Sequence, residues 1–179
     1  MRVIAGSAGG TRLDAPRDRA IRPITDRVKE TLFGILGDRV LDARVLDLYA
    51  GSGAIGIEAL SRGAARATFV ERSHDAVEVI RANLRRTRLQ DLGDVRASQV
   101  DRFLAGADAA APYDLVVLDP PYEERAILAP LERLVPILAP GATVVVKAFW
   151  RTSIPTPEGL RTWRERRFGE TALTFLEVS

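Results

Sequence analysis

The stretch DLYAGSGAIG, residues 47–56, decides the fold of this chain. The apolar residues 44–49 predict a buried β-strand, and residues 54–61 predict a helix directly after the glycines. The residues Gly51 to Gly53 form the turn between them, because glycine accepts the backbone angles of a tight turn. The free amides of the helix start then point at whatever lies above the turn. We therefore expect a ligand-binding strand–turn–helix unit.

Strands and helices alternate along the chain, which predicts a mostly parallel, doubly wound α/β sheet. Ligands bind such a sheet beyond the carboxyl ends of its strands, where every motif described below falls. A small β-hairpin extension and a basic loop (residues 1–24) precede the main domain (residues 25–179), and the whole forms one compact unit. The expected strands cover residues 3–5, 11–13, 44–49, 67–71, 95–98, 114–119, 142–148, 161–167 and 173–178, and the expected helices cover 26–36, 54–61, a stretch capped by Ser73, and 124–138.

The composition excludes several kinds of chemistry. The chain has no cysteine and a single histidine, His74, so disulfides, thiolate nucleophiles and a multi-histidine metal site are ruled out and we expect no metal. No apolar stretch approaches the roughly 20 residues of a membrane helix. No signal peptide opens the chain, because Arg2 and Gly6 interrupt any apolar run. These features predict a cytoplasmic protein without a membrane partner.

Nearly all of the positive charge is arginine. The net charge is +2, and Lys29 and Lys147 are the only lysines among 26 basic residues. Arginine suits phosphate contacts and stacking on bases, although the codon usage of a GC-rich genome explains the same bias. The arginines clustered at 81–88 and 161–167 are interpreted as solvated faces, and those of the N-terminal loop as RNA contacts. Trp150 and Trp163 are interpreted as packing residues.

Two carboxylates indicate which cofactor the glycine turn holds. Glu71 ends the second strand of the main domain, twenty positions after Gly51, where it can accept the ribose hydroxyls of an adenosine. This spacing also fits a dinucleotide site with the pattern G-x-G-x-x-G. Asp47, however, would repel a pyrophosphate and attract a sulfonium or an ammonium group. The turn therefore favours S-adenosylmethionine over NAD.

The most specific motif is DPPY, residues 119–122, which directly follows a strongly apolar strand. Two prolines in succession give a stiff turn that offers carbonyls and no amide donors. The carboxylate of Asp119 and the carbonyl of Pro120 can both accept hydrogen bonds from a substrate amine, which orients the nitrogen lone pair towards a methyl donor. Tyr122 supplies a face on which an extruded base can stack. The motif therefore predicts methylation of an exocyclic amine on a base.

Together these motifs resemble the bacterial 16S ribosomal RNA guanine-N2 methyltransferases of the RsmD family. The resemblance covers essentially the whole chain. It is carried by RVIAG at residues 2–6, RPITDRVKETLF at 22–33, DLYAGSGAIGIEALSRGA at 47–64 and DPPY at 119–122. It implies a Rossmann-like class I methyltransferase fold, with a mixed seven-stranded sheet, helices on both faces and an N-terminal β-hairpin extension. It also implies 16S ribosomal RNA as partner, within partly assembled 30S subunits, and a monomeric enzyme.

The residues and the resemblance together give three sets of candidates. The expected catalytic residues are Asp119, Pro120, Pro121 and Tyr122. The expected cofactor-binding residues are Asp47, Tyr49, Ala50, Gly51, Ser52, Gly53, Glu71, Arg72, Gln99 and Asp119. The expected RNA contacts are Arg12, Arg17, Arg19, Arg22, Thr25 and Arg27.

The chain departs from the family pattern at three positions. Ile24-Thr25 stands where the family often has Thr-Thr, Gln99 where an aspartate often lies near the adenine, and Lys147 where a glutamate is common. We expect none of the three to touch the methyl-transfer centre.

Other functions remain open from the residues alone. An amine methyltransferase acting on DNA adenine or protein glutamine would share the Pro-Pro-Tyr turn. A non-catalytic RNA-binding assembly factor would keep the fold, although the intact DPPY argues against lost chemistry. An NAD-dependent oxidoreductase is disfavoured, because no Tyr-x-x-x-Lys pair follows Tyr113 or Tyr122.

Overall fold

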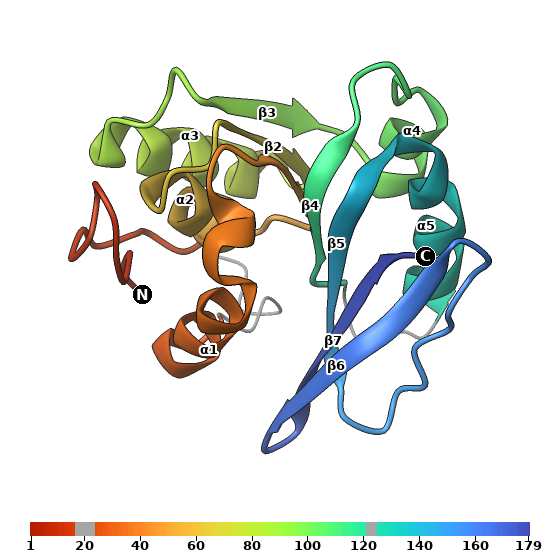
Figure 1. Ribbon diagram of the computed structural model, residues 1–179. Coiled ribbons are helices and arrows are strands. Elements are labelled where there is room, and N and C mark those ends of the chain that lie inside the picture. Colours follow the sequence, from red (N-terminus) through yellow and green to blue (C-terminus); the bar gives the residue numbers. More distant parts are fainter. Residues whose placement is uncertain (17–23, 121–124) are drawn as a thin grey trace.

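The computed structural model describes residues 1–16, 24–120 and 125–179, with the side chains of residues 125–128 outside the description (Figure 1). The candidates Arg17, Arg19, Arg22, Pro121 and Tyr122 therefore lie outside the described residues. Within the described part of the chain, no helix is long and apolar enough to cross a membrane.

The described residues form one mixed sheet of seven strands, as expected, and the strand order is β3-β2-β1-β4-β5-β7-β6. The first five run parallel, and β7 pairs antiparallel with both β5 and β6. The strands are β1 (Arg44–Leu48), β2 (Arg66–Glu71), β3 (Gly93–Ala97), β4 (Tyr113–Leu118), β5 (Leu138–Phe149), β6 (Leu160–Phe168) and β7 (Thr171–Val178). The chain order reverses around β1, between β2 and β4, which is where an open parallel sheet binds its ligand.

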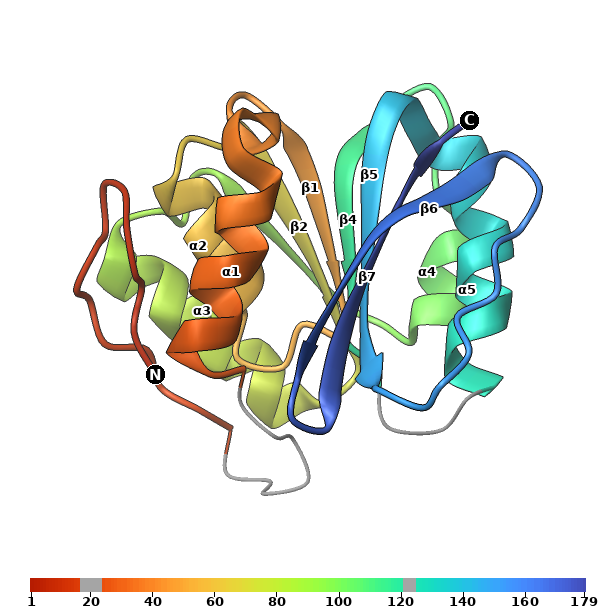
Figure 2. The same cartoon turned by 60° about the horizontal axis from the view of Figure 1, so that its bottom comes forward.

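Helices cover both faces of the sheet (Figure 2). One face carries α1 (Asp26–Leu36), α2 (Ala54–Ser61) and α3 (His74–Thr87), and the other carries α4 (Val100–Ala105) and α5 (Arg125–Leu134). Successive strand residues point to opposite faces, so Val45 packs under the first layer and Leu46 under the second. Both layers bury apolar side chains, which explains why the strands read as continuous apolar runs. Two 3₁₀ helices, η1 (Gly37–Val40) and η2 (Val135–Ile137), connect elements.

The expected helix starts are confirmed by their caps. The hydroxyl of Thr25 accepts from the amide of Val28, and the hydroxyl of Ser73 accepts from the amide of Ala76. The short helix α4 was not expected, because six residues carry too little periodicity to separate a helix from a loop. Strand β5 begins at Leu138 rather than at the expected residue 142, yet its pairing with β4 jumps from Leu138 to Thr143. The residues before 142 thus form an irregularity inside the strand.

The N-terminal extension forms a weaker hairpin than expected. Its backbone pairs through one antiparallel bridge, between Arg2 and Arg12, and through bonds such as that from the amide of Val3 to the carbonyl of Thr11. The expected strand over residues 3–5 is wrong, because the amides of Ile4 and Ala5 donate to the side chain of Glu58 instead. A carboxylate on α2 therefore replaces a partner strand.

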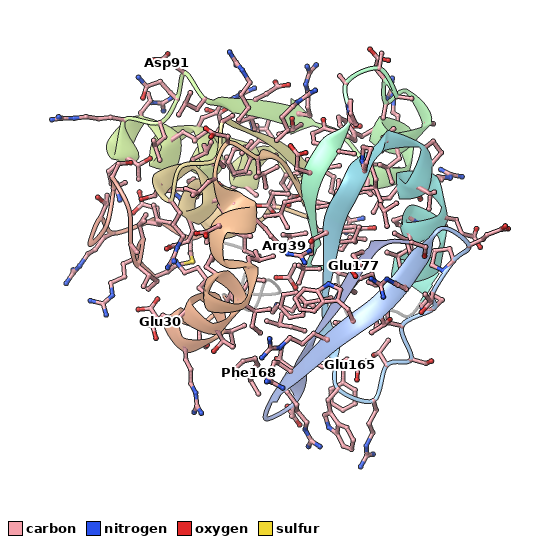
Figure 3. The ribbon with its side chains drawn as sticks, viewed as in Figure 1. Glu30, Arg39, Asp91, Glu165, Phe168 and Glu177 are labelled. Carbon is pink, nitrogen blue, oxygen red and sulfur yellow. The ribbon has the colours of Figure 1, made fainter. Side chains whose placement is uncertain are left out.

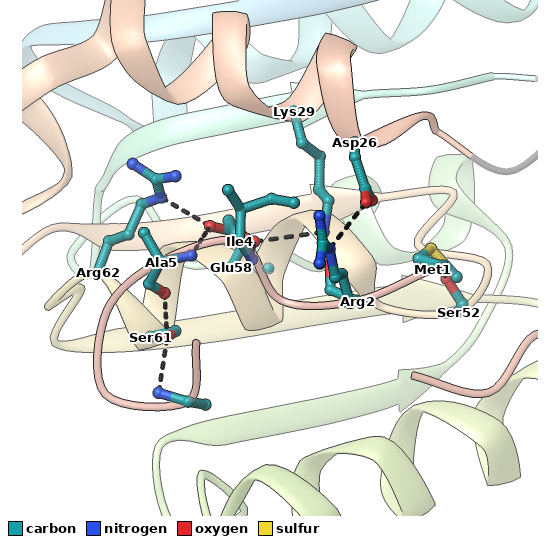
Figure 4. A network of polar contacts seen from close by, with 12 residues as sticks. Met1, Arg2, Ile4, Ala5, Asp26, Lys29, Ser52, Glu58, Ser61 and Arg62 are labelled. Carbon is teal, nitrogen blue, oxygen red and sulfur yellow. Dashed lines mark hydrogen bonds and ion pairs between the residues drawn. The ribbon is translucent and has the colours of Figure 1, made fainter. Parts of the chain in front are cut away.

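Glu58 is the centre of a buried polar network (Figure 4). Its carboxylate receives hydrogen bonds from Lys29 Nζ at 3.3 Å and from Arg62 Nε at 2.8 Å, besides the two backbone amides. Glu58 and Lys29 are both fully buried, and Lys29 also donates to the carbonyl of Arg2. A buried ion pair is tolerated only when its hydrogen bonds are satisfied. The network therefore fixes the extension against α1 and α2.

Asn83 of α3 links the extension to the glycine turn. Its side-chain oxygen accepts from the amide of Asp14 at 2.8 Å. Its side-chain nitrogen donates to the carbonyls of Asp14 and Ser52, both at 3.0 Å. One buried amide thus satisfies three backbone groups from two distant segments.

Candidate active site

The glycine turn follows β1 at the centre of the sheet. Three of its residues have positive φ angles: Tyr49 (60°), Gly51 (57°) and Gly53 (76°). For a tyrosine this left-handed conformation costs about 1–2 kcal/mol, and such strained residues cluster at functional sites. Gly53 precedes α2 as its N-cap, and its amide donates to the carbonyl of Ala50 at 2.7 Å. The turn is thus held open above the carboxyl end of β1.

Glu71 joins the end of β2 to this turn. Its carboxylate accepts from the amide of Gly51 at 2.9 Å and from the amide of Ser73 at 2.8 Å, one bond on each oxygen. Each carboxylate oxygen can accept a second hydrogen bond. Glu71 can therefore still receive the two hydroxyls of a ribose, in the role expected from its position.

Asp47 lies beneath the turn, and its side chain is buried. It accepts one hydrogen bond, from the amide of Gly56 at 2.9 Å. The pKa of Asp47 is raised to about 8, mainly by burial; the bond from Gly56 opposes the rise, and the negative charges of Asp119 and Glu71 contribute to it. Three carboxyl groups thus converge on one region. This donor set fits a cationic ligand such as the sulfonium and ammonium of S-adenosylmethionine, and disfavours a pyrophosphate.

Asp119 follows β4 and is paired with Lys147 of β5. The ammonium of Lys147 lies 2.5 Å from Asp119 Oδ1 and 2.7 Å from Oδ2. Burial raises the pKa of Asp119, whereas the charge of Lys147 and its hydrogen bonds lower it. Contrary to expectation, Lys147 therefore contacts a candidate residue of the methyl-transfer centre, because parallel pairing of Leu118 with Val146 sets the next two residues side by side.

A sequence signal for Lys147 exists. It is the single charged residue in the apolar segment ATVVVKAF, residues 142–149, and a lone charge in a buried strand needs a partner. The strand pairing that supplies this partner was not visible from the sequence.

The remaining candidates for the cofactor lie around the turn. Ala50 and Ser52 are buried, and the Ser52 hydroxyl contacts the sulfur of Met1 at 3.6 Å. Arg72 and Gln99 are exposed at the ends of β2 and β3, and Gln99 is the N-cap residue of α4 without a side-chain capping bond. Its amide is thus available to an adenine edge.

The proline pair and the RNA candidates are described in part. Pro120 is buried directly after Asp119, whose amide donates to the carbonyl of Leu48 at 3.4 Å and ties the motif to β1. Arg12, Thr25 and Arg27 are exposed on the extension and on the start of α1. Among the residues that the structure describes, no group of acidic, histidine or cysteine side chains is arranged to hold a metal ion.

Comparison with known proteins agrees with this geometry. The model of a family described as "Conserved hypothetical protein 95" matches residues 1–177. Ribosomal RNA small subunit methyltransferase D of Escherichia coli K12 is 35% identical over 176 residues, which cover 96% of this chain and 87% of the relative. The chain belongs to the RsmD family.

Two further relatives support this membership. The RsmD protein of Haemophilus influenzae is 33% identical, with 94% of this chain and 89% of the relative covered. The solved structure of a hypothetical protein from Thermus thermophilus is 32% identical, covers 99% of both chains and superposes with a TM-score of 0.85. The fold is accordingly the Rossmann-like fold of class I methyltransferases.

Proposed function

We propose that this RsmD family member transfers a methyl group from S-adenosylmethionine to the exocyclic N2 of one guanine in 16S ribosomal RNA. The relatives that carry the name of small-subunit ribosomal RNA methyltransferases support the RNA class. One observation carries the choice of an amine: the Asp119 carboxylate and Pro120 end β4 directly beside the glycine turn of β1. In this proposal the enzyme is a cytoplasmic monomer. Its substrate is the RNA within partly assembled 30S subunits.

The chain's own residues then act by positioning. S-adenosylmethionine supplies a methyl group on a sulfonium when it is bound. Glu71 and the backbone of Gly51 to Gly53 would hold its adenosine, and the carboxyl of Asp47 would balance its positive charge. Asp119 and the carbonyl of Pro120 accept hydrogen bonds from the amine, whose lone pair is otherwise delocalised into the ring. Methylation makes the amine acidic enough to lose a proton without a strong base.

Lys147 contributes through Asp119. An ionised carboxylate accepts from an amine more strongly than a protonated carboxyl group, yet burial favours the protonated form. The adjacent ammonium opposes this effect and fixes the orientation of the carboxylate. Lys147 uses one lone pair on each oxygen, so further lone pairs remain for the substrate.

The test is tritium transfer from labelled S-adenosylmethionine to 30S subunits from cells lacking this protein, followed by nucleoside analysis. We expect N2-methylguanosine at a single site, and loss of label with Asp119→Ala. Label on DNA or on a protein glutamine would instead indicate another amine methyltransferase. Tight RNA binding with no label on any substrate would indicate an assembly factor without catalysis.

A further inference from the structure

The surface beyond the end of β5 carries an aromatic ring close to two basic side chains. The guanidinium carbon of Arg167 lies 3.7 Å from the ring centroid of Trp150, and that of Arg151 lies 4.7 Å from it. Arg167 is also held by a hydrogen bond from its Nε to the carbonyl of Gly169 at 2.8 Å. This set, Trp150, Arg151 and Arg167, is called here the Trp150 cluster.

Trp150 lies outside the two hydrophobic core clusters of the described residues, whereas Trp163 packs against the larger one, as expected. Trp150 packs instead on its neighbour Phe149, with 6.1 Å between the two ring centroids. The ring of Trp150 is half-buried, and both arginines are exposed. A large aromatic side chain kept at the surface by cations is suited to bind a partner.

The cluster lies next to the candidate active site. Phe149 pairs with Thr171, and the amide of Trp150 donates to the carbonyl of Glu170, which places the cluster at the turn between β6 and β7. Figure 2 shows this turn beside the end of β5, and Figure 3 labels Phe168 close to it. Trp150 is three residues after Lys147, or about 10 Å along an extended chain.

The local charge favours an anionic partner. Residues 150–151 and 164–170 hold four arginines and two glutamates, so this small region carries as much net positive charge as the whole chain. Guanidinium groups bind phosphates, and both guanidinium planes and indole rings stack on unpaired bases. An acidic peptide could pair with the arginines, but its carboxylates would not stack on the ring of Trp150.

We propose that the Trp150 cluster binds the single-stranded RNA that flanks the target guanine. A nucleotide next to the target stacks on Trp150 or on the guanidinium planes, while Arg151 and Arg167 contact its phosphates. This binding site rests on the proposed RNA methyltransferase function and adds a second anchor to it. Holding the flanking strand keeps the target base extruded, since the extrusion has a free-energy cost.

The chain offers its own optical probe, because Trp150 and Trp163 are the only tryptophans. The buried indole nitrogen of Trp163 has no hydrogen-bond partner in the described structure, so Trp163→Phe removes no hydrogen bond. In this background we expect a short single-stranded RNA to quench the fluorescence of Trp150 saturably, and added salt to reverse the quenching. Unchanged fluorescence at RNA concentrations that the protein binds would overturn the proposal.

Methylation of 30S subunits gives the second measurement. Trp150→Ala should raise the KM for 30S subunits about five- to 100-fold, as expected for the loss of one stacked base. Trp150→Phe keeps an aromatic ring, so its KM should stay much closer to that of the wild type. The turnover number and the affinity for S-adenosylmethionine should stay unchanged. Arg167→Gln should weaken the salt dependence of KM. The control is Arg96→Gln, which should not change it, because Arg96 is exposed on β3 at the opposite edge of the sheet.

The two proposals fail in different ways. If the wild type is active and Trp150→Ala has the same KM for 30S subunits, the RNA-binding role of the Trp150 cluster is wrong. The proposed methyltransferase function is then unaffected. A wild-type protein that methylates no RNA, while Trp150 is still quenched by RNA, would sink the function and keep the cluster as an RNA contact.

Discussion

Lys147 favours the ionised form of Asp119, which is the stronger hydrogen-bond acceptor. In Lys147→Met the two effects that lower the pKa of Asp119 are removed, and burial, which favours the protonated form, remains. The pKa of Asp119 rises further, so the acid limb of the turnover profile moves to higher pH. We expect activity near pH 6 to fall about tenfold or more and to recover partly as the pH increases.

The control for this prediction is Lys147→Arg, which keeps the charge and should keep the acid limb near its wild-type position. A purely structural role of Lys147 would lower activity equally at every pH. Steady-state rates from about pH 5.5 to 9 separate the two cases.

Asp47 links cofactor binding to protons. With a pKa of about 8, Asp47 holds a proton near neutral pH in the free protein. A bound cation stabilises the ionised form, so S-adenosylmethionine should release this proton. We expect the affinity to rise with pH, up to about tenfold per unit below pH 8. Calorimetric titrations in two buffers of different ionisation enthalpy would detect the released proton, and Asp47→Asn should abolish it.

The same residue affects the stability of the free protein. Its folded-state pKa exceeds the ordinary value of an aspartate, so the stability that Asp47 contributes is complete below about pH 4 and is lost as the pH rises through about 8. Asp47→Asn can still accept the bond from Gly56 and carries no charge to bury. As the pH rises, the unfolding temperature of this variant should therefore fall less steeply than that of the wild type. Parallel pH curves would contradict a raised pKa.

At the scale of elements, the extension approaches the end of α2 very closely at Gly6. A β-carbon added at Gly6 would lie 1.7 Å from the carbonyl oxygen of Ser61, and one at Gly10 would meet nothing within 4 Å, although φ is +83° at both positions. We expect Gly6→Ala to lower the free energy of unfolding by about 3 kcal/mol or more, and Gly10→Ala by about 1–2 kcal/mol. Urea denaturation would measure the difference, and equal losses would mean that the close approach is not essential.

The sequence identified most elements of this fold for physical reasons. Helix α2 begins and ends where expected, because the glycine turn and the following apolar run mark it on both sides. The sequence also indicated that the carboxyl groups of Asp47, Glu71 and Asp119 lie near one another, since parallel strands place their carboxyl ends along one edge of the sheet. Pairing across the sheet and between layers was hidden, which is why Lys147 and the Glu58 network were missed.

At the scale of the whole molecule, the extension is part of the core rather than an appendage. Val3, Ala8 and Leu13 are buried in the larger hydrophobic cluster, and Glu58 and Lys29 depend on the backbone of residues 2–5. Removing residues 1–14 should therefore cost about 3–5 kcal/mol or more, because it exposes apolar surface and strips partners from a buried ion pair. Calorimetry should show one lowered transition, whereas an unchanged transition would mean an independent extension.

Asn83 gives the molecule a reporter that needs no label. The amide of Asp14 belongs to the extension, yet its hydrogen-bond acceptor also holds the carbonyl of Ser52 in the glycine turn. A ligand that stiffens the turn should slow hydrogen–deuterium exchange at Asp14, far along the chain from any cofactor contact. If RNA binding orders the extension, it should also tighten cofactor binding. Because linkage is reciprocal, the cofactor should then raise the affinity for RNA by the same factor. The two substrates would then bind cooperatively through a single asparagine.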